Sequence, residues 1–370
     1  ITGSVGKTSS KDLLATVSSQ FGGVCKAEKS FNNHLGVPLT LARTKPKNDF
    51  LIVEIGMSNR KEIGPLSKLV KPHIALITNV SEAHLASFRG ISEIAKEKSD
   101  ICYGLVTGGT CVLSRDSEKY KSLYKYVKEF GVKLISFGCD EDSDHRLTKI
   151  VIKDNKTCAA ATLSDGEELF FKINSPGVHY AKNALGVISV LIILGLDLTR
   201  GILSMLKWAP GSGRGLITHV QCGRKYLARS FTLIDETYNA NPKSLTAALN
   251  VLVNFSIEST EYDDDCRVRR IAILGDMLEL GADENKKHAD LAKKLDLSEI
   301  DLIHCVGSCM RFFYSNLPDS KKGKWAATAT DFLDNISELV RDKDIIMLKA
   351  SNGVGLNLLL KKLKAMGTPN

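Results

Sequence analysis

The chain has 370 residues, enough for two or three domains, and its 43% hydrophobic and 25% charged content is typical of a globular protein. The formal net charge of +8 favours anionic ligands such as nucleotides, but no run of basic residues interleaved with aromatic residues indicates binding to nucleic acid. The longest apolar run, Ala184–Leu196, is too short to cross a bilayer, and nine scattered cysteines without a CxxC pair indicate the reduced thiols of a cytoplasmic protein.

A glycine-rich segment at the beginning of the chain predicts a phosphate-binding loop. Its members are Gly3, Ser4, Val5, Gly6, Lys7 and Thr8. In such a loop the backbone N–H groups face the phosphates, the lysine adds a positive charge, and the threonine hydroxyl can bind Mg²⁺. The alternative is a glycine and serine turn that happens to precede a helix. Because such a loop normally follows a buried strand, and only Ile1 and Thr2 precede it here, we expect an N-terminal part of the protein to be missing from this chain.

The segments that follow alternate between helical patterns and short apolar runs. We expect buried strands at Phe50–Ile55, His73–Asn79, Cys111–Leu113 and Lys133–Phe137. We expect helices at Thr8–Gln20, Ile91–Leu105, Tyr120–Phe130 and Tyr180–Leu194. Antiparallel strands are expected at Ile150–Leu163 and Glu168–Ile173. This order predicts an α/β fold, with a central P-loop ATPase domain built on a mostly parallel sheet.

A second α/β unit begins near Tyr226. Its expected strands are Leu227–Asp235, Arg270–Leu274, Leu302–Val306 and Ile345–Leu348. Its expected helices are Lys243–Phe255 and His288–Leu295. We therefore divide the chain into a central ATP-binding domain at residues 1–225 and a C-terminal Rossmann-like domain at residues 226–370.

Polar side chains stand where the strands of the first domain end. Glu54 and Asn79 follow two of the expected strands, and His84 lies in the loop after the second. Because ligands of open α/β sheets bind beyond these strand ends, we expect the three residues to converge with Lys7 and Thr8. A carboxylate there is the expected partner of a Mg²⁺ ion bound by Thr8. The alternatives are a solvated carboxylate for Glu54 and an ordinary loop histidine for His84.

Further positions allow more than one interpretation. By its helical context Lys98 is a solvated lysine, and Asn183 either reads an adenine edge or caps a helix. Arg214, which lies between two glycines, is either an arginine finger for the γ-phosphate or a hinge-loop arginine. The segment Asp235–Pro242 follows a strand, so its acidic residues suit ribose hydroxyls, or it is an ordinary strand–turn–helix corner. Gly275–Gly281 follows the next strand, on the same edge.

Taken together, these segments resemble the Mur ligase superfamily. The resemblance is carried by Thr2–Thr8, Asn32–Leu41, Glu54–Met57, Ile77–Val80, Ala83–Leu85, Ser175–His179, Asn183–Leu185, Tyr238–Pro242 and Leu274–Gly281. It extends over nearly the whole chain. Within the superfamily, these segments are most similar to the ligases that add D-alanyl-D-alanine to UDP-N-acetylmuramoyl-tripeptide.

The resemblance implies an ATP-dependent amide ligase of cytoplasmic peptidoglycan precursor synthesis, which forms an acyl phosphate with the help of two Mg²⁺ ions. It implies that Lys7 binds the β- and γ-phosphates. The implied metal-binding residues are Thr8, Glu54, His84 and Lys98. Lys98 aligns with a lysine that is carbamylated in relatives, and that role replaces the solvated lysine. The implied nucleotide-binding residues beyond the loop are Asn79, Asn183, Arg214, Asp235, Glu236, Tyr238 and Asn239. The resemblance also implies that the small N-terminal domain, which holds the UDP-sugar, is absent from this chain.

Three departures from the family pattern affect these roles. Glu236 stands where relatives have Asp, so both Asp235 and Glu236 are candidates for the ribose. Tyr180 replaces an Asn, and Ala350 and Asn352 replace a Gly and an Arg in a segment tied to the acceptor dipeptide. Two rival functions are another ligase of the superfamily, such as a folylpolyglutamate synthase, and a P-loop ATPase of a different class. We expect a monomer whose partners are the sugar-nucleotide tripeptide and D-alanyl-D-alanine, with no nucleic acid.

Overall fold

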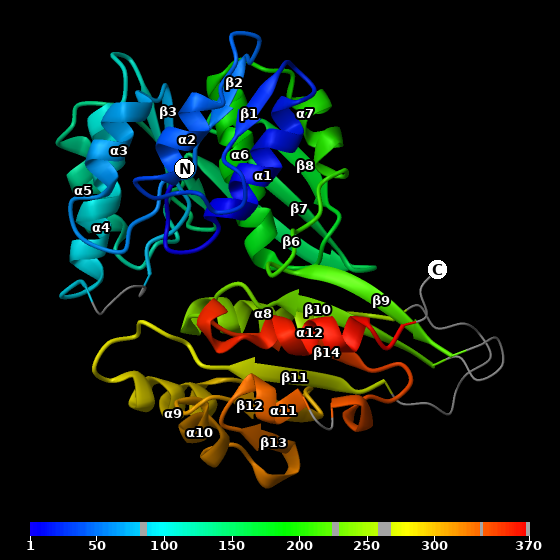
Figure 1. Ribbon diagram of the computed structural model, residues 1–370. Coiled ribbons are helices and arrows are strands. Elements are labelled where there is room, and N and C mark those ends of the chain that lie inside the picture. The colour runs from blue at the N-terminus through cyan, green and yellow to red at the C-terminus, as the bar shows by residue number, and fades with distance from the viewer. Residues whose placement is uncertain (82–86, 224–228, 258–267, 334–335, 368–370) are drawn as a thin grey trace. The chain divides into compact units, whose positions relative to one another are not determined.

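The computed structural model describes residues 1–81, 87–223, 229–257, 268–333 and 336–367 (Figure 1). The chain divides into two compact units, Ile1–Ala209 and Pro210–Asn370. Each unit is built around its own sheet, as the sequence predicts. No helix in the described part of the chain combines the length and apolar character needed to span a membrane.

A six-stranded sheet forms the first unit. Its strands lie in the order β3 (Ile74–Ile77), β4 (Thr110–Ser114), β5 (Lys133–Gly138), β6 (His145–Lys153), β7 (Lys156–Thr162) and β8 (Glu168–Ile173). The pairs from β3 to β6 are parallel, and β7 and β8 extend the sheet in antiparallel pairs. A separate parallel pair is formed by β1 (Val24–Lys26) and β2 (Phe50–Ile52). Thr2 bridges to Ile77 of β3, so the first residues occupy the place of the expected strand.

The prediction of one strand over Ile150–Leu163 is wrong, because the chain reverses within it. Asp154 and Asn155 both have left-handed φ angles, 51° and 55°, and they join β6 to β7 as a two-residue hairpin loop. Positive φ at both central residues is the geometry that fits the twist of paired strands, and Asp and Asn tolerate it better than most residues.

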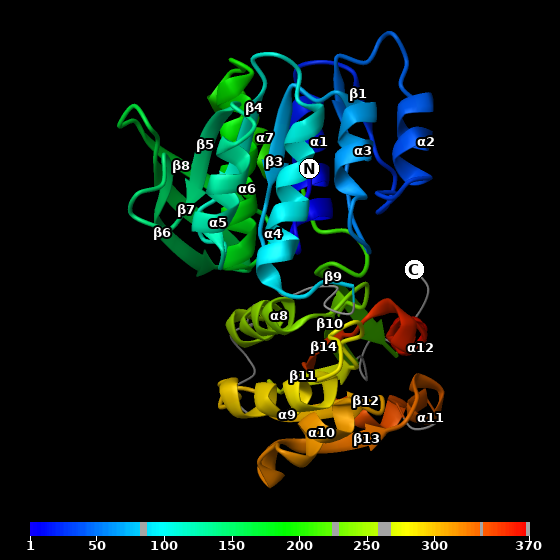
Figure 2. The same ribbon diagram turned by 90° about the vertical axis from the view of Figure 1, so that its left-hand side faces the viewer.

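Helices cover both faces of the parallel part of this sheet (Figure 2). On one face lie α1 (Lys7–Ser18), α6 (Val178–Ile193) and α7 (Leu198–Met205), packed against side chains such as Leu76 and Val112. On the other face lie α2 (Gly36–Ala42), α3 (Ile63–Val70), α4 (Ile91–Ser99) and α5 (Tyr120–Lys128). The helix expected over Ile91–Leu105 is α-helical only to Ser99 and continues as the 3₁₀ turn η1 (Asp100–Gly104). Alternate residues of each strand face opposite cores, as in a doubly wound fold.

The second unit repeats this principle with a different strand order. Its sheet runs β13 (Lys322–Ala326), β12 (Leu302–Val306), β11 (Arg270–Gly275), β14 (Ile345–Lys349), β10 (Arg229–Glu236) and β9 (Leu216–Cys222). One face is covered by α8 (Pro242–Asn254), α9 (Glu284–Lys294) and α10 (Met310–Ser315). The other is covered by α11 (Ala329–Leu333) and α12 (Leu356–Lys364). The 3₁₀ turns η2 (Asp319–Lys321), η3 (Ile336–Leu339) and η4 (Asn352–Val354) complete the unit.

Strand β9 accounts for a difference between the expected and observed division of the chain. It pairs antiparallel with β10 along its whole length, from Leu216 opposite Asp235 to Cys222 opposite Arg229. The second unit therefore begins at Pro210, whereas the predicted boundary at residue 225 falls after β9. All other pairs in this sheet are parallel, so β10, β11 and β14 end at one edge.

Candidate nucleotide site

The predicted phosphate loop is hydrogen-bonded to the end of strand β3. The N–H of Ser4 donates to the carbonyl of Asn79 (2.9 Å), and the hydroxyl of Thr78 donates to the carbonyl of Val5 (2.6 Å). The N–H of Ser81 donates to the hydroxyl of Ser4 (3.0 Å). The loop is thereby held at the carboxyl edge of the parallel sheet, where ligands of such sheets bind.

Gly6 is a position in this loop that requires glycine for two reasons. Its φ of 83° is left-handed, and a Cβ atom there would lie 2.7 Å from Oδ1 of Asn183. Asn183 therefore lies directly beside the loop. It is inside α6, which begins at Val178, so the alternative that Asn183 caps this helix is wrong. Lys7 begins α1, and its Nζ donates to the carbonyl of Gly3 (2.7 Å).

Thr8 and Glu54, the predicted metal pair, are in direct contact. The hydroxyl of Thr8 donates to Oε2 of Glu54 (2.8 Å), and the amide of Asn32 donates to Oε1 (2.8 Å). Glu54 is 0% exposed, which rules out a solvated carboxylate. Each carboxylate oxygen still has a second lone pair for another partner.

Lys98 is buried on α4 instead of solvated, with 2% of its surface exposed. Burial is the main reason why its pKa is well below the ordinary value for lysine, and the positive charge of Lys7 lowers it further. The neighbouring carboxylate of Glu97 acts in the opposite direction but is engaged elsewhere. It accepts the backbone N–H groups of Glu62 (2.9 Å) and Ile63 (3.0 Å) at the start of α3.

Two polar atoms just after strand β3 lack partners among the described residues. They are Oδ1 of Asn79 and the hydroxyl oxygen of Ser81, and both are buried. Such atoms cost free energy unless a ligand or a water reaches them. Oxygen atoms of this kind, like those of Thr8 and Glu54, are the ligand type that Mg²⁺ and its water shell prefer. Nowhere in the described part of the chain do three His, Cys, Asp or Glu side chains gather as a metal site, and His84 lies outside the described residues.

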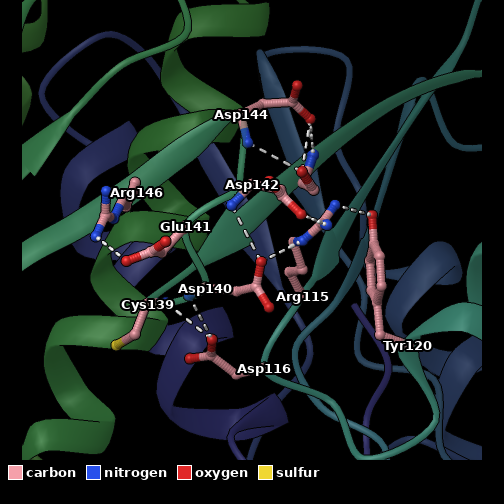
Figure 3. Close-up of polar contacts among 10 residues, drawn as sticks. Arg115, Asp116, Tyr120, Cys139, Asp140, Glu141, Asp142, Asp144 and Arg146 are labelled. Atoms are coloured by element: carbon pink, nitrogen blue, oxygen red, sulfur yellow. Dashed lines mark hydrogen bonds and ion pairs between the residues drawn. The ribbon is translucent and has the colours of Figure 1, made fainter.

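Next to Asn183, the loops after β4 and β5 are tied together (Figure 3). Asp116, after β4, accepts the N–H groups of Cys139 (2.8 Å) and Asp140 (3.2 Å), after β5. Its other carboxylate oxygen lies 2.6 Å from Nζ of Lys182, the neighbour of Asn183 on α6. These contacts hold the helical turn that carries Asn183.

In the second unit, the carboxylate of Asp235 is fully occupied by its own loop. Oδ2 accepts the N–H of Gly213 (2.7 Å) and the hydroxyl of Ser212 (3.1 Å). Oδ1 accepts the hydroxyl (2.7 Å) and the N–H (3.2 Å) of Thr237. Asp235 is also 0% exposed, so it organises the loop before β9 and the turn after β10.

Glu236 and the other predicted nucleotide residues of this unit are arranged around one buried lysine and one aromatic ring. Nζ of Lys349, at the end of β14, donates to Oε2 of Glu236 and to the carbonyl of Asn239, both at 3.0 Å. The guanidinium carbon of Arg214 lies 4.0 Å from the ring centroid of Tyr238, a cation–π contact. Glu236 and Lys349 end two neighbouring parallel strands, so this cluster lies at the carboxyl edge of the sheet.

The segment Tyr238–Pro242 is also a strand–turn–helix corner. Asn241 caps α8 through its side chain, which accepts the N–H of Ser244 (2.8 Å), and Pro242 is the first helical residue. The nearby Asp276 accepts the N–H of Met310 (2.6 Å). This part of the second unit is therefore stabilised largely by its own side chains.

Some residues of these clusters are not among those that the sequence predicts for the site. The clearest cases are Asn32, Lys349 and Lys11, whose Nζ lies 3.9 Å from Oε2 of Glu54. Lys11 had one detectable signal, because it falls three residues before Leu14, on the buried face of α1. Asn32 comes from a loop whose path no local pattern shows.

Comparisons with known proteins place both units in one family. Residues 1–191 match the Mur ligase middle domain, and residues 223–352 match the Mur ligase glutamate ligase domain. A ligase of Synechocystis, named UDP-N-acetylmuramoyl-tripeptide--D-alanyl-D-alanine ligase, is 31% identical over 99% of this chain and 74% of its own length.

Solved structures agree. A crystal structure of MurF from Acinetobacter baumannii has a TM-score of 0.84 and 26% identity, covering 98% of this chain and 75% of that one. The MurF ligase of Thermotoga maritima in complex with ADP has the same fold, with a TM-score of 0.82 at 21% identity over 99% of this chain and 79% of that one. The resemblance seen in the sequence is confirmed: the chain belongs to the Mur ligase family.

Proposed function

We propose that this chain carries the catalytic units of an ATP-dependent amide ligase that joins D-alanyl-D-alanine to UDP-N-acetylmuramoyl-tripeptide. The observation that carries the proposal is the contact between Thr8 and Glu54 beside a phosphate loop, in a member of a family whose similar relatives bear that name. Membership of this family argues against a P-loop ATPase of another class. The segment Tyr238–Pro242 favours this reaction over other ligases of the family.

In this proposal, the phosphate loop binds ATP and the strand ends hold the metal. Lys7 and the N–H groups at the start of α1 contact the β- and γ-phosphates. Thr8, Glu54 and His84 hold Mg²⁺, and Asn79 orients its water shell through the unpaired amide oxygen. The metal ions, when bound, neutralise the phosphate charge. Asn183 contacts the adenine from beside the loop.

Lys98 has the properties of a lysine that accepts carbon dioxide. Its lowered pKa leaves a larger share of the amine uncharged near neutral pH, and only the uncharged amine is a nucleophile. The nitrogen attacks the carbon of CO₂ and then loses a proton, which gives a carbamate with one negative charge. That anion supplies oxygen ligands for a second Mg²⁺ and gains a favourable charge partner in Lys7.

For the second unit we assign the ribose to Glu236 in preference to Asp235. Both oxygens of Asp235 already accept two hydrogen bonds each from its own loops, whereas the Glu236 carboxylate has one partner among the described residues, Lys349. Arg214 contacts the γ-phosphate, with Tyr238 supporting its guanidinium and Asn239 lining the same edge. We keep the division into a central ATP-binding part and a C-terminal part, with the second part beginning at Pro210.

The proposed reaction proceeds in two steps. The carboxylate of the tripeptide attacks the γ-phosphorus, displaces ADP and becomes an acyl phosphate. The amine of D-alanyl-D-alanine then attacks the acyl carbon, loses a proton and expels phosphate. The protein mainly positions the partners and stabilises charge. Because ATP is the energy source, we place the reaction in the cytoplasm, with the enzyme as a monomer.

Phosphate release from ATP by the full-length protein tests this proposal. We expect release only when UDP-N-acetylmuramoyl-tripeptide and D-alanyl-D-alanine are both present, and we expect it to vanish in Lys7→Ala. Release that ignores both substrates would refute the ligase assignment. Omitting bicarbonate and CO₂ should lower the rate if Lys98 works as a carbamate, and should have no effect in Lys98→Ala.

A further inference from the structure

Lys11 is a buried lysine to which the proposed mechanism gives no role. It lies one helical turn after Lys7 on α1 and is only 1% exposed. Its Nζ lies 3.9 Å from Oε2 of Glu54 and 3.6 Å from Oδ1 of Asp12. A lysine is rarely buried to this degree unless its charge is compensated, so the carboxylates explain its place in the core.

The same amine also anchors the loop that leads to Asn32. Nζ of Lys11 donates to the carbonyl of Lys29, a residue with a left-handed φ of 47°. The next residue, Ser30, contacts the hydroxyl of Thr8 at 3.3 Å. Asn32 reaches Oε1 of Glu54 from the same loop. Lys11 thus holds both the carboxylate and the segment that orients it.

The approach of Asn32 is closely fitted. The N–H of Gly56 donates to the carbonyl of Asn32 (2.9 Å), and a Cβ atom at Gly56 would lie 2.7 Å from the Asn32 side chain. A shift of the loop would therefore move the Asn32 amide, which now donates to Glu54 at 2.8 Å. Lys11 holds this loop in place through its hydrogen bond to the carbonyl of Lys29.

We propose that Lys11 is a positioning residue for the metal site, which holds the Glu54 carboxylate and the loop at Lys29 in place before Mg²⁺ binds. The inference deepens the proposed function, since it assumes that Thr8 and Glu54 hold the ion. Lys11 acts through Glu54 and through the loop at Lys29, and it does not itself contact the nucleotide. Preorganised ligands bind more tightly because less order must be imposed on binding.

The test compares Lys11→Met with Lys11→Arg in the full chain. Calorimetry measures ADP affinity with and without Mg²⁺, and the quantity of interest is the ratio of the two. We expect Lys11→Met to reduce the gain from Mg²⁺ about tenfold, the usual range for loss of a residue that orients a metal ligand. Metal-free affinity should change less than about twofold, because Lys7 and the loop provide it. Lys11→Arg, which keeps the charge, should recover most of the gain.

Lys26→Met is the matched control. Lys26 is exposed and pairs with Asp12 at 2.6 Å, and it forms no ion pair with Glu54 among the described residues, so its loss should leave the ratio unchanged. Thermal unfolding without ligand reports whether each variant is folded. If Lys11→Met does not fold, Asn32→Ala tests the same path from its other end, and we expect a similar loss of the gain from Mg²⁺.

Two results would overturn the proposal. An unchanged ratio in Lys11→Met and in Asn32→Ala would show that Lys11 has a purely structural role. A larger gain from Mg²⁺ would show that Lys11 repels the ion. Calorimetry needs no ligase substrate. A protein whose Mg²⁺-dependent gain in ADP affinity depends on Lys11, but which lacks ligase activity, would therefore refute the proposed reaction and leave this inference standing.

Discussion

Glu54 and Asp235 carry the same signature in the sequence and have different surroundings in the structure. Both stand at the end of an apolar strand, Glu54 just after β2 and Asp235 in the last part of β10, and both are 0% exposed. Glu54 accepts hydrogen bonds from two side chains, Thr8 and Asn32. Asp235 accepts four hydrogen bonds, two of them from backbone N–H groups of its own loops.

The difference shows that a carboxylate at a strand end marks the edge of a sheet. By itself it does not show that a ligand binds there. What decides its role is the number of donors that the neighbouring loops supply. The four donors of Asp235 occupy its lone pairs, so it stabilises the fold. Glu54 keeps lone pairs for another partner, and one of its two donors, Thr8, is itself a metal-binding type of residue.

The largest effect is expected from Glu54→Gln. Turnover should fall about 10³-fold, or about 4 kcal/mol in transition-state free energy, because an amide cannot replace the charge that holds the cation. The free energy of unfolding should change by no more than about 1 kcal/mol, since Gln fills the same space. Phosphate release and thermal unfolding measure the two quantities. A variant that loses stability and keeps its turnover would place Glu54 in the same structural class as Asp235.

The second effect concerns His304, which lies on β12 in the core of the second unit. Burial, and then the charges of Arg269 and Lys324, lower its pKa from 6.5 to about 4. Between pH 6.5 and about 4, His304 is therefore protonated in the unfolded chain and neutral in the folded unit. The free energy of unfolding falls as the pH falls through this range. The loss should approach about 3 kcal/mol at the lower end.

Asp100, in the first unit, should contribute in the opposite direction over part of this range. Burial raises the pKa of Asp100 to about 6, so its folded form binds protons more readily than the unfolded chain. Trp208 reports on the first unit and Trp325 on the second, so single-tryptophan variants separate the two responses. His304→Asn should flatten the acid-induced loss of stability seen by Trp325, because Asn does not bind a proton in this pH range. The variant should still fold, since the Asn oxygen can accept the N–H of Lys324 that Nδ1 accepts at 2.8 Å. An unchanged acid loss in that variant would exclude His304 as its cause.

Much of the fold can be predicted from the sequence, because its signals are local. The phosphate loop, the apolar strands that end at Glu54 and Asn79, and the long helix with Asn183 all follow from residue order and periodicity. Strand β9 cannot be recognised in this way, since Leu216–Cys222 becomes a strand only by pairing with β10. The reversal at Asp154 and Asn155 is missed because apolar residues continue on both sides of it.

The site is predicted less completely, because burial and loop paths are properties of tertiary structure. Lys98 looks like a solvated helix lysine in isolation, and it is the packing of α4 that buries it and lowers its pKa. Asn32 and Lys11 enter the site through the loop at Lys29, whose shape depends on a hydrogen bond between distant residues. The role proposed for Lys98 comes from the family resemblance, because residue patterns alone do not indicate it.

The smallest effect, and the most direct test of the comparison, is Asp235→Asn. An Asn side chain has one acceptor oxygen, so its amide must face either the N–H of Gly213 or the N–H of Thr237. A buried donor left in this way costs about 2 kcal/mol, which denaturant unfolding followed at Trp325 would detect. Glu236→Gln is the matched control, because its oxygen can still accept from Lys349, and its cost should be about 1 kcal/mol or less.

Nucleotide affinity should follow the reverse order, unchanged in folded Asp235→Asn and weakened in Glu236→Gln. If Asp235→Asn instead weakens nucleotide binding without loss of stability, the carboxylate binds ribose after all, and donor count would not distinguish structural from functional strand-end acids in this chain.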